Sequence, residues 1–357
     1  MHILIFIFGA GIVALTLASA IKTFVLPRSA SDGIVRIVFL LIRSLFNLRV
    51  RFSSTYQERD WVMAYYAPVS LLALLPVWLG LVMTGFTGMF WAAGSGDWST
   101  AFHTSGSSLL SLGLVTNEGF FYSILKFGEA TIGFLLVALL ISYLPTMYSA
   151  FSRRESAVTL LEVRAGSPPS AVEMLLRFYR IHGLDRLEEQ WRLWETWFAD
   201  IQESHTSLPA LVFFRSPLPQ HSWVNAAGTI LDTASLTLAV VDIPHDPQAD
   251  LCIRAGYLAL RHIAGFFRVE YDPNPRPTDP ISITRQQFDE ACLKLEQGEL
   301  PLKPDRDKAW RDFAGWRVNY DTVLLALTRL TMAPDAPWTS QRSSSEILAM
   351  ESGGISN

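Results

Sequence analysis

Two long apolar runs separated by a short polar segment constrain this chain more than any other feature. The first runs from Trp61 to Ala93 and the second from Ile124 to Phe151. Either run is long enough to cross a bilayer, whereas the Ser- and Thr-rich segment between them is too short and too polar. Non-helical backbone at membrane depth is tolerated only where protein buries it or a water-filled cavity lies beside it. The pattern predicts a spanning helix, a re-entrant half-helix and a second spanning helix, as in a pore domain.

The polar segment itself has the spacing of a half-helix over residues 98–112. Phe102 and Leu109 recur at helical intervals, and Ser99 or Thr100 is suited to cap the start. The C-terminal end of such a half-helix would point into the membrane, where its partial negative charge favours a cation in a central cavity. An ordinary Ser-rich extracellular loop is the alternative.

The stretch Ser-Ser-Leu-Leu-Ser-Leu-Gly-Leu-Val-Thr at 107–116 resembles the selectivity filter of potassium channels. The family's filter reads Thr-Val-Gly-Tyr-Gly-Asp, with another Thr three residues before it. The corresponding positions here are Ser108, Ser111, Leu112, Gly113, Leu114, Val115 and Thr116. Val115 stands in place of the family's second Gly and Thr116 in place of its Asp. A β-branched residue adopts the backbone angles of a carbonyl-lined filter far less readily than Gly does.

The resemblance covers residues 61–154 and implies a homotetramer in which each chain supplies one quarter of the pore. Conduction would use the backbone carbonyls of residues 112–115, with the hydroxyls of Ser108 and Ser111 at the inner mouth. Potassium or another monovalent cation would be the permeant ion, and no cofactor is expected. The substitution at Val115 keeps two alternatives open: a non-conducting membrane scaffold or sensor, and a pore of relaxed ion selectivity.

Three residues of the second apolar run are further pore or gate candidates. Glu129 is costly inside a spanning helix unless it faces protein or water. It would either accept hydrogen bonds from the end of the half-helix or be an interfacial carboxylate near Lys126. Gly133 offers close packing or a bend. Pro145 would kink the helix near its cytoplasmic end, either as a gate or without a gating role.

Basic residues before and after the runs predict the topology. Lys and Arg are frequent between Lys22 and Arg59 and recur from Arg153 onward, whereas residues 94–123 contain none. The positive-inside rule therefore places the N-terminus outside and the C-terminal part in the cytoplasm of a multi-pass protein of the cell (inner) membrane. A cleaved secretory signal is the alternative for the N-terminal apolar run, residues 3–26.

The chain divides into five predicted segments. They are an N-terminal spanning helix (1–26), an interfacial amphipathic segment (27–60), the pore module (61–152), an α-helical cytosolic domain (153–338) and a disordered tail (339–357). The amphipathic segment has apolar residues around Arg36 and Arg43 and is predicted to lie on the membrane surface, or else on the soluble domain. The fold class is therefore an all-α membrane protein.

Helical periodicity continues through the cytosolic part. The predicted helices are 172–182, 186–203, 222–241, 248–267, 284–298 and 305–332, with a break at 166–170 and a Pro-rich loop at 272–280. Trp191, Trp194 and Phe198 form a predicted core stripe, and Trp197 lies off it.

Several function classes have no support in the sequence. The net charge of −4 argues against a nucleic-acid partner, and no phosphate-binding loop or nucleophile motif occurs. The histidines and the two cysteines, Cys252 and Cys292, lack the spacing of a metal site. The segment 242–246 is either a cation site or, as we favour, a solvated loop. We therefore expect no catalytic residues, no metal site and no enzyme activity.

Overall fold

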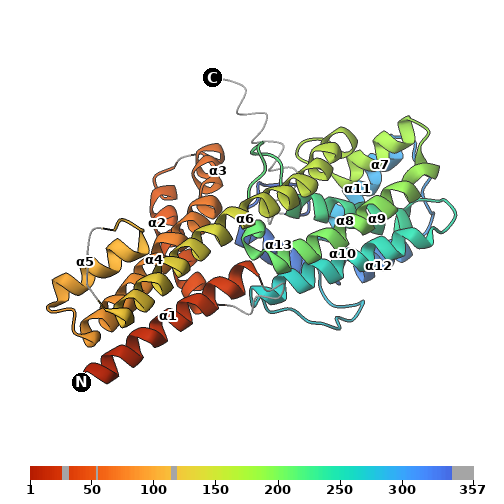
Figure 1. Cartoon of the computed structure of the whole chain (residues 1–357). Helices are drawn as coiled ribbons and strands as arrows, with labels where there is room; N and C mark the ends of the chain where they lie inside the picture. Colours follow the sequence, from red (N-terminus) through yellow and green to blue (C-terminus); the bar gives the residue numbers. More distant parts are fainter. Residues whose placement is uncertain (26–31, 54, 114–118, 340–357) are drawn as a thin grey trace. The chain divides into compact units, whose positions relative to one another are not determined.

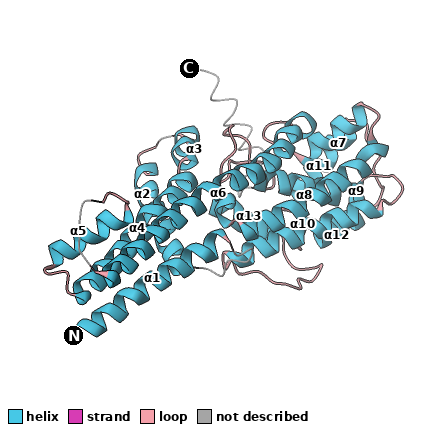
Figure 2. Ribbon diagram, in the orientation of Figure 1, coloured by secondary structure: helices cyan, strands magenta, loops and turns pink. Residues whose placement is uncertain are grey.

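The computed structural model describes residues 1–25, 32–53, 55–113 and 119–339 (Figure 1). In these ranges the chain is helical without a β-strand, apart from an isolated antiparallel bridge between Val241 and Leu302 (Figure 2). The predicted all-α class is confirmed. The chain forms two compact units, Met1–Ser149 and Ala150–Asn357, which are described separately below as the N-terminal and C-terminal units.

Three helices among the described residues are long and apolar enough to cross a membrane. They are α1 (His2–Phe24), α4 (Tyr66–Ala93, which follows the short α3, Tyr56–Ala64) and α6 (Phe120–Ala165). In the most apolar stretch of each, only 28% to 39% of the residues are buried. Most of their apolar surface is thus left for lipid or for other chains. This agrees with the predicted membrane protein. The apolar run 61–93 is, however, divided between the end of α3 and the whole of α4, a break that the sequence did not indicate.

Helices α1 and α4 pack antiparallel along their length. His2 stacks on Trp91 with ring centroids 4.6 Å apart, and near the other end the indole Nε1 of Trp78 donates to the Ser19 hydroxyl at 3.1 Å. Between these contacts a Cβ on Gly85 would lie only 2.7 Å from the Gly9 carbonyl oxygen. The two backbones therefore touch at a pair of glycines, as small residues allow between membrane helices.

Replacing Gly85 by Val is expected to separate α1 from α4, because the new side chain meets backbone that cannot rotate away. Overpacking of this kind costs about 1–3 kcal/mol. The midpoint of thermal unfolding of the detergent-solubilised chain should fall by several degrees. Gly80→Val is the matched control on the same helix, because nothing lies within 4 Å of a Cβ there. Equal midpoints for the two variants would contradict the packing.

Helix α2 (Gly33–Val50) is the predicted amphipathic segment. Asp32 caps it by accepting from the backbone N–H groups of Ile34 and Val35. Its exposed apolar side chains are Ile37, Leu40, Leu41, Leu45 and Leu48. The opposite face packs on α4 through aromatic contacts to Tyr66. The exposed apolar stripe leaves the predicted place of this helix at the membrane surface open, and that place stays a prediction.

The C-terminal unit is a helical domain around one apolar core. Its elements are the end of α6, α7 (Ala171–Arg180), η1 (Leu184–Arg186), α8 (Leu187–Ser207), η2 (Pro209–Phe213), α9 (Trp223–Val240), α10 (Pro247–Phe266), α11 (Arg285–Gln297), α12 (Arg306–Arg317) and α13 (Asp321–Thr331). The predicted break at 166–170 and loop at 272–280 are both present. The aromatic stripe of α8 is buried, and Trp197 is buried beside it.

Two sequence expectations for this unit are wrong in detail. Residues 305–332 form two helices, because the side-chain amide of Asn319 donates to the carbonyls of Gly315 and Trp316 and competes with the helical backbone. Thr339 was assigned to the tail but is buried, and its hydroxyl lies 3.1 Å from Oδ1 of Asn225. The rest of the predicted tail, 340–357, lies outside the described residues.

Candidate pore site

The half-helix between the two apolar runs is α5 (Trp98–Leu109). Its N-cap is Asp97, which accepts from the Thr100 N–H at 2.9 Å, so the expected Ser99 or Thr100 cap is wrong. Hydrogen bonds from Thr100 hold the pKa of Asp97 below its ordinary value. The carboxylate outcompetes the neighbouring hydroxyls as a cap because it carries a full negative charge beside the positive end of the helix dipole.

Helix α5 descends between α4 and α6. The Tyr122 hydroxyl donates to the Ala93 carbonyl at 2.9 Å, which places the end of α4 and the start of α6 at one level. Ser105, buried on α5, has its hydroxyl 3.1 Å from the carbonyl oxygen of Met83. Met83 lies ten residues before Ala93, which corresponds to about 15 Å along a helix. A segment lying on the membrane surface would not reach this depth.

Glu129 on α6 meets the same serine. Its carboxylate is fully buried, and Oε1 lies 2.5 Å from the Ser105 hydroxyl. Oε2 has no hydrogen-bond partner among the described residues. Of the two alternatives from the sequence, the structure has the one in which Glu129 faces the half-helix. Ser105 itself was missed as its partner, because the sequence gives no signal for which α5 residue faces α6.

Gly133 allows the closest approach of α5 to α6. A Cβ at this position would lie 2.8 Å from the carbonyl oxygen of Leu109, the last residue of α5. Close packing rather than a bend is thus its structural use. Ser108 lies on α5 one turn after Ser105, and its hydroxyl donates to the Lys126 carbonyl at 2.7 Å. That proton is therefore used within the chain, and only the oxygen lone pairs of Ser108 remain for the predicted role at the pore mouth.

The chain leaves α5 through a Schellman turn. The N–H of Leu112 donates to the Ser107 carbonyl at 2.8 Å, and the N–H of Ser111 donates to the Ser108 carbonyl at 3.0 Å. Ser111 and Gly113 are both left-handed, with φ of 57° and 67°. Leu112 and its two neighbours are exposed. The half-helix thus ends three residues before the predicted residue 112. Ser111 and Gly113, the two left-handed residues that follow, have the backbone conformation that Gly adopts without strain.

The remaining pore candidates are placed only in part. Leu114, Val115 and Thr116 lie outside the described residues. Pro145 lies inside α6, which is continuous from Phe120 to Ala165. Its role as a gate or kink stays a prediction.

The end of α6 is held in the C-terminal unit by a buried arginine. Arg154 donates to the carbonyls of Leu211 and Phe214 at 2.8 and 2.7 Å and pairs with Glu155. Its Nη1 also lies 3.2 Å from Nε2 of His205. Because a guanidinium only donates, Nε2 must accept and His205 must be neutral. Burial, followed by the Arg154 charge, holds the pKa of His205 well below 6.5.

Stability of the C-terminal unit is therefore expected to fall with acidification. Below the unfolded pKa of 6.5 only the unfolded chain protonates His205, which favours unfolding by about 1.4 kcal/mol per pH unit. The loss from this group therefore sets in as the pH falls through 6.5 and grows with further acidification. His205→Gln, which keeps an acceptor for Arg154, should remove that part of the pH dependence of the thermal midpoint. An unchanged pH profile in the variant would contradict this assignment.

Comparison with known proteins identified no similar protein. The chain matches no protein-family model, and neither curated proteins nor solved structures give a match. Within residues 1–25, 32–53, 55–113 and 119–339, no group of His, Cys, Asp and Glu side chains could hold a metal ion.

Proposed function

We propose that this chain is one subunit of a homotetrameric, potassium-channel-like pore that conducts a monovalent cation passively across the cell membrane. The observation that carries the proposal is the depth of α5. Its Ser105 hydroxyl meets α4 and α6 about 15 Å below the level at which those helices end. A half-helix inserted between two spanning helices presents non-helical backbone at membrane depth, which is stable only beside protein or water.

The charge distribution favours a cation. Residues 94–113 contain no Lys or Arg. The C-terminal end of α5, where the helix dipole is negative, lies among the helices of the N-terminal unit. The left-handed Ser111 and Gly113 follow directly. Backbone carbonyls in such a segment can replace the hydration shell of an ion.

A tetramer also accounts for the uncovered faces of the spanning helices. Large side chains such as Phe127 and Phe134 on α6 are about 70% exposed in one chain, at 72% and 69%. Lipid covers part of this surface, and neighbouring subunits around a central pore would cover the rest.

The test is ion flux into liposomes that contain the purified chain, under potassium, sodium and chloride gradients in turn. We expect potassium flux from the parent protein and none from Gly113→Val, because Val does not adopt the left-handed conformation of residue 113. Gly113→Asn is the matched variant, since Asn tolerates this conformation, and it should retain flux.

Each other outcome has a definite meaning. A folded tetramer that passes no ion under any gradient would favour the non-conducting scaffold. Equal sodium and potassium flux would indicate relaxed selectivity, and chloride flux would contradict a cation pore.

A further inference from the structure

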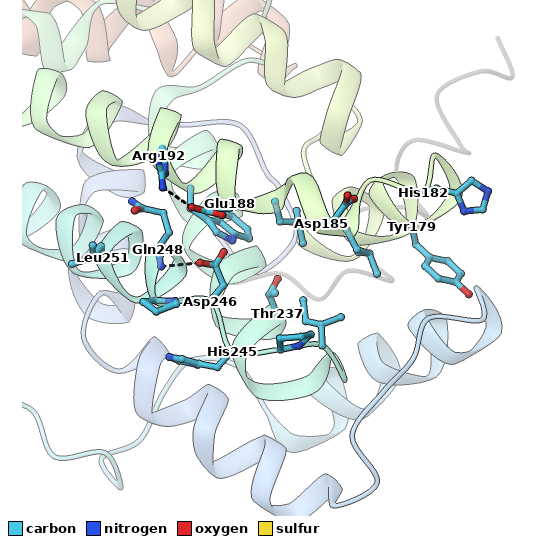
Figure 3. A pocket seen from close by; sticks show the side chains of 16 residues that line it. Tyr179, His182, Asp185, Glu188, Arg192, Thr237, His245, Asp246, Gln248 and Leu251 are labelled. Atoms are coloured by element: carbon cyan, nitrogen blue, oxygen red, sulfur yellow. Dashed lines mark hydrogen bonds and ion pairs between the residues drawn. The ribbon is translucent and has the colours of Figure 1, made fainter.

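A cavity of about 810 Å³ in the C-terminal unit lies among the end of α7, the start of α8 and the start of α10 (Figure 3). Figure 3 shows Glu188 beside Arg192, with which it pairs at 2.6 Å, and Asp246, which caps α10 by accepting from the Gln248 N–H. Trp191 also lines the cavity, and its indole Nε1–H has no hydrogen-bond partner among the described residues. That side chain is fully buried and out of reach of a ligand, so the cavity is not assigned one.

Helix α2 of the N-terminal unit, by contrast, has an exposed apolar stripe together with positive charge that no acid on the helix balances. Five large apolar side chains, each 55% to 66% exposed, lie on the face turned away from α4: Ile37, Leu40, Leu41, Leu45 and Leu48. Their spacing is that of a single helical face. Residues 33–53 also contain no Asp or Glu but have four arginines, Arg36, Arg43, Arg49 and Arg51.

The arginines lie along the edges of this stripe. Arg36 precedes Leu40 by four residues and Arg43 follows it by three, so both lie beside it on one edge. Arg49 follows Leu45 by four residues and lies on the other edge. At the border of an apolar surface an arginine buries its aliphatic stem and keeps its guanidinium in the polar layer. There the guanidinium forms strong, paired hydrogen bonds to a phosphate group.

Two hydrogen bonds hold α2 at the ends of the spanning helices. The Ser19 hydroxyl, near the end of α1, donates to Asp32 Oδ2 at 2.6 Å. The Tyr66 hydroxyl, at the start of α4, donates to the Phe39 carbonyl at 3.4 Å. Because α1 and α4 are antiparallel, these two ends lie on the same side of the N-terminal unit. A bilayer spanned by α1 and α4 has its phospholipid headgroups near this level.

We propose that the exposed face of α2 binds the anionic phospholipids of the leaflet at this end of α1 and α4. The apolar stripe enters the boundary of the acyl chains, and the arginines pair with the lipid phosphates. A second α2 packed on the stripe would bring four further arginines against these, and like charges repel. The inference does not depend on ion conduction.

A fluorescent label within the stripe tests the occupant. Ser44 is exposed and lies between Leu40 and Leu48 on the same face, so Ser44→Cys carries the environment-sensitive label NBD. Both native cysteines are buried. Thr196→Cys, at an exposed position of α8, is the matched control. The full chain is placed in liposomes that contain spin-labelled phosphatidylcholine or spin-labelled phosphatidylglycerol at the same mole fraction, and the quenching of NBD is compared.

The expected result has two parts. Both lipids should quench the label at residue 44, and neither should quench the label at residue 196. Quenching at residue 44 should be several-fold stronger with phosphatidylglycerol, because each arginine near an anionic leaflet favours binding by a factor of roughly five.

Two double variants test the arginines. Arg36→Gln/Arg43→Gln keeps the apolar stripe, so phosphatidylcholine should still quench the label, but the preference for phosphatidylglycerol should fall by at least half. Arg276→Gln/Arg311→Gln removes two exposed arginines of the C-terminal unit and should leave the preference unchanged. Salt at about 1 M should also reduce the preference, because it shortens the Debye length to about 3 Å.

The proposal is overturned if the two lipids quench the label at residue 44 equally or if the two double variants behave alike. It is also overturned if neither lipid quenches this label. In that case a blue-shifted NBD emission would show that protein, such as a second copy of the chain, covers the stripe, and an emission typical of water would show that nothing does.

Discussion

Replacing Gly133 by Val is expected to abolish ion flux through the proposed pore and to lower the midpoint of thermal unfolding. A Cβ at residue 133 would lie 2.8 Å from the Leu109 carbonyl oxygen and 3.1 Å from Leu109 Cδ1. The carbonyl belongs to backbone at the end of α5, so it cannot turn aside as a flexible side chain would. Helix α5 must therefore shift, and the segment that begins at Leu110 must shift with it.

The depth of α5 makes this substitution more damaging than an ordinary overpacked site. The same helix holds Ser105 against Glu129 and Met83, and the contact with Glu129 is buried. Moving α5 away from α6 would leave the Glu129 carboxylate without its serine in an apolar environment. Burying a charged or polar group without a partner costs several kcal/mol, which adds to the overpacking.

Gly128→Val is the matched control, because Gly128 lies on the same helix and nothing lies within 4 Å of a Cβ there. Flux in liposomes and the unfolding midpoint in detergent are measured for both variants. The midpoint tests the packing even if the parent chain does not conduct. A Gly133→Val protein with the flux and midpoint of the parent would contradict the α5–α6 contact.

The sequence predicted most helices because their apolar periodicity is strong. Helices α7, α10 and α11 each begin within two residues of the predicted position, since a capping residue or a proline marks each start. The single helix expected over 305–332 failed for a local reason. The pattern of apolar residues continues across the turn. The end of α12 is marked instead by the Asn319 side chain, which donates hydrogen bonds to the preceding carbonyls of Gly315 and Trp316.

The candidate site was predictable as a set of residues but not as a set of contacts. Glu129 and Gly133 were singled out because an acid and a glycine are unusual in a spanning helix. Their partners, Ser105 and Leu109, depend on how α5 crosses α6, and no spacing rule within either helix fixes that crossing. The unpaired Trp191 N–H is a further example, because along the sequence that tryptophan is only one member of an aromatic core stripe.

Arg317→Met is expected to cost the C-terminal unit about 3–5 kcal/mol, because it removes the only guanidinium from a buried network of carboxylates. Arg317 is fully buried; it pairs with Asp232 and Asp321, and it also donates to the Trp338 carbonyl at 2.6 Å. Methionine fills a similar volume without charge. Asp232 would then be ionised in an apolar interior or would have to take up a proton, and both outcomes destabilise the folded state at pH 7.

We expect the thermal midpoint of the full chain, measured by tryptophan fluorescence, to fall by about 10 °C. Arg192→Met is the control, since the ion pair of Arg192 with Glu188 is solvent-exposed and such pairs contribute less than about 1 kcal/mol.

A second substitution separates lost charge balance from lost packing. Asp321 keeps two hydrogen bonds from the Ser282 N–H and hydroxyl, at 2.7 and 2.6 Å, whereas Asp232 keeps one from the Tyr320 hydroxyl at 2.9 Å. Asp232 therefore depends more on Arg317. Adding Asp232→Asn to Arg317→Met should therefore recover part of the lost midpoint, because the uncompensated charge is gone while the side-chain volume stays. If the double variant were less stable than Arg317→Met, packing of the guanidinium rather than its charge would be what stabilises this core.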